Sequence, residues 1–132
     1  MIDVSYGYSK SMGVVEFDDA VGRVTEALKG QGFGVLTQID VTDTLKKKLD
    51  VDFRNYRILG ACNPPLAHRA LSEELMIGLL LPCNVIVFEE DDATVTVSAV
   101  NPNEMFKVVE NTALGDLAGS VDTKIKAVLA AL

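Results

Sequence analysis

The segment most informative about the fold spans residues 83–100 and reads CNVIVFEEDDATVTVSAV. Apolar residues alternate with polar ones along 94–100, and 83–89 is a short, mostly apolar run opened by Pro82, a position that strands tolerate. Four consecutive acids at 89–92 form the short turn between these ends. Strands joined by so tight a turn pair antiparallel, because a parallel pair needs a much longer crossover. The segment therefore predicts an antiparallel hairpin and favours an α+β fold.

On either side of this hairpin, the same patterns predict further strands and several helices. Strands are expected at 4–9, continued by an extended piece at 14–17, and at 33–41 and 56–62. Helices are expected from an N-cap at Asp18 to Gly30, at 42–49, at 66–75, in a short turn capped by Asn101 or Asn103, and from 112 to the end. We therefore expect a single domain over residues 1–132. It should be a two-layer α+β sandwich, with helices on one face of a mostly antiparallel, curved sheet.

The strand at 33–41 carries a face prediction of its own. Strict alternation puts one set of residues on its more apolar face: Phe33, Val35, Thr37, Ile39 and Val41. The opposite face is then the more polar one, with Gly34, Leu36, Gln38 and Asp40. Such a strand is typical of a sheet that packs on one side and meets water on the other.

Composition restricts the classes of partner. The 132 residues carry a formal net charge of −7, which argues against nucleic acid and against docking on anionic lipid. The longest apolar run, 75–81, is far shorter than the roughly 20 residues that cross a bilayer. The N-terminus lacks the basic and apolar regions of a signal peptide, so we expect a cytoplasmic protein. Its two cysteines are then expected to be reduced thiols.

Those cysteines lie in two copies of one dipeptide, and they are the main hint of chemistry. Cys62-Asn63 closes the strand at 56–62, and Cys83-Asn84 opens the strand at 83–89. If the two strands are antiparallel neighbours, both dipeptides lie at the same end of the sheet. If the helix between them is a parallel crossover, they lie at opposite ends, roughly 15 Å or more apart. The α+β fold favours the first arrangement.

Gathered cysteines have several uses. They can form a redox pair or bind a soft metal, helped by the positive end of the helix after Pro64 and by a nitrogen of His68. The simpler interpretation is that Cys62 and Cys83 are small hydrophobic residues of the core. No paired C-x-x-C zinc signature is present, and the four acids at 89–92 lack the glycine and the spaced oxygens of a calcium loop. The sequence alone names no metal and no cofactor.

Three stretches resemble one protein family. They are FGVLTQIDV at 33–41, LGACNP at 59–64 and GLLLPCNV at 78–85, and they resemble domain of unknown function 302 of bacteria and archaea. The first stretch usually has glutamate where Gln38 stands here. The resemblance implies a fold like one half of the TATA-box-binding protein (strand, helix, four strands, helix) and a homodimer. It implies no activity and no DNA binding, since a fold does not fix a function.

Three hypotheses about function remain open at this point. The favoured one is a homodimeric protein that binds a small molecule near Cys62, Asn63, His68, Cys83 and Asn84, where asparagine amides offer donors and acceptors. The second is a thiol- or metal-dependent enzyme that uses the two cysteines. The third is an interaction module whose apolar run at 75–81 contacts a partner.

Overall fold

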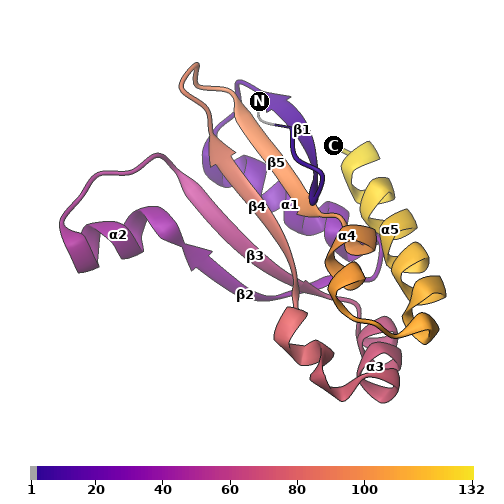
Figure 1. Ribbon diagram of the computed structural model, residues 1–132. Coiled ribbons are helices and arrows are strands. Elements are labelled where there is room, and N and C mark those ends of the chain that lie inside the picture. Colours follow the sequence, from indigo (N-terminus) through magenta and orange to yellow (C-terminus); the bar gives the residue numbers. More distant parts are fainter. Residues whose placement is uncertain (1–2) are drawn as a thin grey trace.

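A computed structural model describes residues 3–132 of the chain. Its five strands form one sheet in the order β1-β5-β4-β3-β2, and every neighbouring pair is antiparallel (Figure 1). The strands are β1 (Gly7–Gly13), β2 (Gly34–Asp40), β3 (Tyr56–Cys62), β4 (Cys83–Glu89) and β5 (Val95–Val100). The helices are α1 (Phe17–Gly30), α2 (Val41–Leu49), α3 (Pro64–Glu73), α4 (Pro102–Met105) and α5 (Gly115–Ala130), with 3₁₀ turns η1 (Leu75–Leu80), η2 (Phe106–Val108) and η3 (Thr112–Leu114). The expected α+β fold is confirmed.

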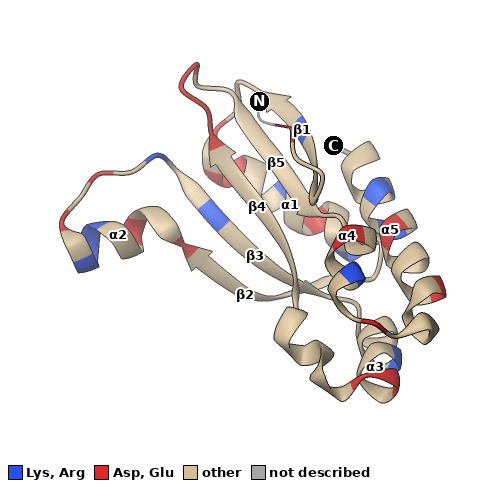
Figure 2. Cartoon of the chain, in the orientation of Figure 1, with Lys and Arg blue, Asp and Glu red and all other residues tan. Residues whose placement is uncertain are grey.

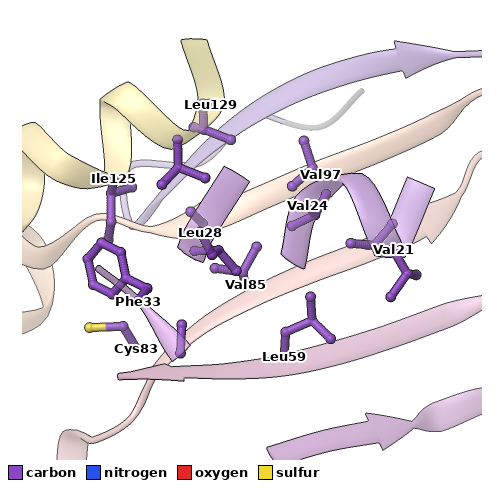
Figure 3. Close-up of a cluster of buried hydrophobic side chains, with 14 of the residues drawn as sticks. Val21, Val24, Leu28, Phe33, Leu59, Cys83, Val85, Val97, Ile125 and Leu129 are labelled. Carbon is purple, nitrogen blue, oxygen red and sulfur yellow. The ribbon is translucent and has the colours of Figure 1, made fainter. Parts of the chain in front are cut away.

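The core lies between one face of the sheet and the two longest helices, α1 and α5. Valines of β4 and β5 supply the sheet side, and apolar stripes of the helices supply the other (Figure 3). No helix within residues 3–132 lies over the opposite face of the sheet (Figure 1). A second, smaller cluster joins α3, η1, η2, η3 and α5, through Ala70, Ile77, Phe106, Leu114, Leu117 and Ala118. This smaller cluster fixes α3 against α5 at the end of the sheet where β3 stops and β4 starts.

A β-bulge at Leu36 corrects the face prediction for β2. Val35 pairs with Ala61 and Thr37 pairs with Gly60, so Leu36 is an extra residue without a partner on β3. An inserted residue reverses the alternation of every side chain beyond it. Val35 therefore packs against the core, whereas Thr37 and Ile39 lie on the uncovered face, and the predicted shared face is wrong. A second irregularity interrupts β1 between Ser11 and Gly13. Both outer strands of the sheet are thus bulged.

Several element boundaries also differ from the predicted ones, and those of α1, α3 and β1 have a clear physical reason or the largest shift. The cap of α1 is Glu16, whose carboxylate accepts from the amides of Asp18 and Asp19, so Asp18 lies inside the helix. Helix α3 begins two residues before the predicted 66, because proline is well suited to the first turn of a helix. Strand β1 covers Gly7–Gly13 rather than 4–9 and 14–17.

Helix α2 is an arm at the end of the β2–β3 hairpin, and it stands away from the rest of the molecule (Figure 1). It buries no residue, and its lysines form exposed ion pairs such as Lys47 with Asp43 at 2.9 Å. Figure 2 shows these mixed charges on the arm and a cluster of acids at the β4–β5 turn. Exposed pairs of this kind add little to stability. The arm therefore does not hold the core together.

One buried carboxylate belongs to the packing of α5 on β1. Asp122 is only 7% exposed, and it accepts a hydrogen bond from the hydroxyl of Tyr8. Its second oxygen lies 3.0 Å from Lys126 Nζ, whose ammonium lies over the Tyr8 ring. A buried carboxylate needs such partners. Burial, then the hydrogen bond to Asp122, raises the pKa of Tyr8.

Within residues 3–132, no helix is both long and apolar enough to cross a bilayer.

Candidate functional site

The two cysteine dipeptides meet at one end of the β3–β4 pair. Ala61 pairs with Cys83 and Gly60 pairs with Asn84 across antiparallel strands. Cys62 is the next residue of β3, so the two thiols lie on neighbouring strands, at the end of the sheet where β3 stops and β4 starts. Helix α3 therefore returns the chain to an antiparallel neighbour instead of crossing over to a parallel one. The alternative that separated the dipeptides is excluded.

A cavity of about 300 Å³ lies between this end of the sheet, α3 and α5. Its wall is almost entirely apolar, and it includes both thiols. The residues that line it are Phe33, Leu36, Thr37, Ala61, Cys62, Asn63, Leu66, Ala67, Ala70, Leu71, Leu81, Pro82, Cys83, Phe106, Leu117 and Val121. Two of them, Leu36 and Leu71, are 68% and 37% exposed, so the cavity reaches solvent on their side. The small side chains of Ala67 and Ala70 leave space on the side of the cavity that α3 forms.

Cys83 is the buried member of the pair. Its side chain lies beside the ring of Phe33 at the edge of the core (Figure 3), and it is 8% exposed. Burial, together with the nearby Cys62, raises the pKa of the Cys83 thiol from 9.0 to about 11. The thiol is therefore neutral near pH 7. A catalytic cysteine needs the opposite shift, because the thiolate is the nucleophile.

Asn63 has both functions of its amide in use. Its Oδ1 accepts from the amide of Leu66 at 3.4 Å and caps α3, while its Nδ2 donates to the carbonyl of Gln31 at 3.3 Å. The loop after α1 admits this contact because Gly32 has φ +82 and carries no Cβ, which would lie 3.0 Å from Nδ2. Asn63 thus ties the end of α1 to the start of α3. It is a structural part of the cavity wall.

The positive end of α3 does not present free amides to the thiols. Pro64 and Pro65, the first two residues of the helix, have no N–H to donate. The next two amides, of Leu66 and Ala67, donate to Asn63 Oδ1 and to the Asn63 carbonyl. Backbone stabilisation of a thiolate at this helix end, which the sequence suggested, is therefore not available from these four residues.

A close approach at Gly60 brings together two residues of the cavity wall, Thr37 and Pro82. A Cβ at this position would lie 2.2 Å from Thr37 Oγ1 and 2.8 Å from Pro82 Cγ. Real Cβ atoms do not come so near, so only glycine lets β2 and the start of β4 pack on β3 here. The bulge at Leu36 belongs to the same arrangement, because it brings Thr37 over Gly60 and leaves Leu36 at the cavity. Bulges of this kind are frequent beside binding sites.

His68 and Asn84, the two other candidates, lie elsewhere. His68 is an exposed residue of α3 and is not part of the cavity wall. Asn84 faces the uncovered side of the sheet, because its neighbour Cys83 faces the covered side and strand residues alternate. Across residues 3–132, no three His, Cys, Asp or Glu side chains are grouped so as to hold a metal ion.

Asn84 instead borders a second hollow, of about 620 Å³, on the uncovered face. Aromatic and aliphatic side chains line it: Tyr56 stacks on Phe88 with ring centroids 5.6 Å apart, and Ile86 of β4 lies in the same wall. Charged Arg54 and Asp91 stand at one rim, joined at 2.9 Å. The face is thus apolar at its centre and polar at its margin.

Several cavity residues carry no sequence signal. Ala67, Ala70, Phe106, Leu117 and Val121 fit ordinary helix stripes, and only the packing of α3 and α5 shows that they line a space. Phe33, Leu36 and Thr37 do belong to the first of the three stretches that resemble a known family. Their place in that stretch is the sequence signal for these three residues.

Comparisons with known proteins agree with that resemblance. The family described as "Domain of unknown function DUF302" matches residues 8–132. The chain is also similar to a solved structure, the crystal structure of an uncharacterized conserved DUF302 protein from Bacillus stearothermophilus. The two are 31% identical, with a TM-score of 0.88, over 97% of this chain and 98% of the other. No curated protein matches the chain.

Proposed function

The chain belongs to the DUF302 family. From the geometry of its site we propose that it binds a small molecule in the cavity beside Cys62 and Cys83. One observation carries the proposal. The three stretches on which the family resemblance rests, 33–41, 59–64 and 78–85, are far apart in sequence, yet each contributes residues to this one cavity. A preformed, mostly apolar cavity at the meeting point of several elements is the usual form of a ligand site.

The observations favour binding over thiol or metal catalysis. The pKa of Cys83 is raised rather than lowered, and Asn63 already uses its amide in holding two helices together. The described residues that line the cavity also lack a general base, since His68 is not among them. The arrangement therefore fits a ligand-binding site better than a catalytic site. Reduced thiols suit a cytoplasmic protein, which is part of the proposal.

A fragment screen followed by NMR tests the proposal. Amide chemical shifts of the whole chain are recorded with a mixture of small neutral and charged fragments. Binding in the cavity should move the resonances of residues 61–71 and 81–83 above all others. The variant Ala67→Leu should lose these shifts, because the larger side chain fills the space left by Ala67. Ala130→Leu, the same change at an exposed position of α5, should keep them.

Shifts spread over the surface, or shifts that survive Ala67→Leu, would contradict the proposal. So would a complete absence of shifts with every fragment. A folded Ala67→Leu is needed for the comparison, and thermal unfolding of both variants checks this. If Ala67→Leu does not fold, Leu71→Phe narrows the cavity from its partly exposed side and replaces it.

A second candidate function, homodimerisation, is favoured by the uncovered face. Phe53 and Tyr6, 45% and 66% exposed, line the same hollow as the Tyr56–Phe88 stack. Ile39, 48% exposed, lies on the same side of the sheet opposite Ile58. A second copy placed on this face would cover these side chains. Sedimentation analysis should then give a dimer for the natural chain and a monomer for Ile86→Lys, which puts a charge at the centre of the face. A natural chain that is monomeric at high concentration would oppose this candidate.

A further inference from the structure

Resting on the proposed function, we infer that the ligand of the cavity is an uncharged, apolar molecule about the size of two fused rings. The inference comes from three properties of the wall: its charge, its remaining hydrogen-bonding capacity and its volume. Each property excludes a class of ligand. Together they leave one class.

The charge of the wall excludes ions. Among the described residues that line the cavity there is no Asp, Glu, Lys, Arg or His. The only titratable groups are the two thiols, and the raised pKa of Cys83 keeps that thiol neutral. A ligand carboxylate, phosphate or ammonium would therefore enter without a counterion, which is strongly unfavourable in apolar surroundings. The net charge of −7 opposes anions further.

The hydrogen-bonding capacity of the wall excludes strongly polar ligands. Asn63 is the one lining residue with a side-chain amide, and each end of that amide already makes one hydrogen bond within the protein, which leaves it one N–H and one lone pair at most. Two wall amides, of Leu66 and Ala67, are also engaged, and the prolines before them have none. The hydroxyl of Thr37 and the weakly bonding thiols remain. They suffice for one neutral polar group, such as an alcohol or a carbonyl.

The volume sets the size of the ligand. A dry, apolar cavity of about 150 Å³ in another protein accommodates benzene. The cavity here has about twice that volume, at about 300 Å³. Two fused aromatic rings, or an aliphatic group of similar bulk, would fill it. The exposed Leu36 and Leu71 at its solvent side extend an apolar surface to an arriving ligand.

Three probes with one ring system test the inference: 2-naphthalenemethanol, 2-naphthoate and 2-naphthylmethylammonium. They are neutral, anionic and cationic at pH 7, and their bulk is nearly equal. Calorimetric titration of the full chain should give a Kd for the alcohol at least about tenfold lower than for either ion. Ala67→Leu should weaken binding of the alcohol by a similar factor, and Ala130→Leu should leave it unchanged.

The outcomes separate this inference from the proposed function. If an ion binds as tightly as the alcohol and Ala67→Leu abolishes both, the cavity is a binding site but its ligand class is not the one inferred. If none of the three probes binds, and the fragment screen also gives no shifts at residues 61–71 and 81–83, both the inference and the proposed function fall. Binding of the alcohol that Ala67→Leu leaves intact would place it outside the cavity and overturn the inference. In a chain where Ala67→Leu does not fold, Leu71→Phe is the deciding variant.

Discussion

The two Cys-Asn corners have the same chemical composition and different surroundings. At the first, the chain leaves β3 for α3 directly after Cys62, so Cys62 and Asn63 both stay at the cavity. At the second, Cys83 and Asn84 are consecutive residues of a continuing strand, so they point to opposite faces of the sheet. One asparagine therefore builds the site and the other leaves it. The role of such a dipeptide thus depends on whether the chain continues from it as a helix or as a strand.

The largest effect is expected at Gly60, which pairs with Asn84 and lies under Thr37 and Pro82. Gly60→Ala should lower the free energy of unfolding by about 3 kcal/mol, because the new Cβ overlaps a short β-branched side chain and a rigid ring. Urea denaturation measures the loss. Adding Thr37→Ala removes the nearest overlapping atom and should restore part of the stability.

Gly34 provides the matched control, because a Cβ there meets nothing within 4 Å and its backbone needs no positive φ. Gly34→Ala should change stability by less than about 1 kcal/mol, in either direction. Equal losses at the two glycines would contradict the close approach at the corner.

The next effect distinguishes the buried thiol by its response to pH. The pKa of Cys83 is 9.0 in an ordinary environment and about 11 in the folded chain. Between these values the unfolded thiol has lost its proton while the folded one keeps it, so rising pH favours the unfolded state. Its contribution to stability is complete below pH 9 and should fall by about 3 kcal/mol as the pH approaches 11.

Other groups titrate in the same range, so the measurement is a difference. Urea denaturation at several pH values should show a steeper decline for the natural chain than for Cys83→Ala. Parallel curves for these two proteins would show that Cys83 is not desolvated as described.

The smallest effect separates the two asparagines. Asn63→Ala removes the cap of α3 and the bond to the Gln31 carbonyl, and it should cost about 1–2 kcal/mol. Asn84 is exposed on a strand, so Asn84→Ala should cost less than about 0.5 kcal/mol. Chemical denaturation of both variants decides the matter. A cost at Asn84 equal to that at Asn63 would remove the distinction between the corners.

Sequence patterns predicted the part of the fold that local chemistry delimits. β3 and β4 have the predicted bounds, because prolines and the acidic turn mark their ends. β1 was misplaced because its core-facing side chains include Lys10, whose ammonium reaches the carbonyl of Leu129 at 3.0 Å. A lysine that points toward the core breaks the apolar alternation on which the prediction depended. The alternation of residue types along β2 does not reveal the bulge at Leu36, because an extra residue changes the direction of the side chains and not the residues themselves.

The candidate site could be predicted only as far as the sheet determines it. Antiparallel pairing of β3 with β4 brings Cys62 and Cys83 to one end of the sheet. The sequence indicates a mostly antiparallel sheet through the hairpin of β4 and β5. The cavity itself arises from how α3 leans on α5, and small residues such as Ala67 and Ala70 look like ordinary helix residues. His68 is a candidate by its chemistry alone, because no periodicity in the sequence fixes the direction of its side chain.

The bulges of β1 and β2 limit how copies of this chain can join. Both outer strands of the sheet carry one, so neither rim offers a flat, regular row of hydrogen-bonding groups to a neighbouring sheet. Growth into a ribbon by strand-to-strand addition is thereby discouraged at both rims. Copies of the chain are therefore expected to associate through the face of the sheet. Two copies that cover each other's faces form a closed dimer and leave no such face for a third.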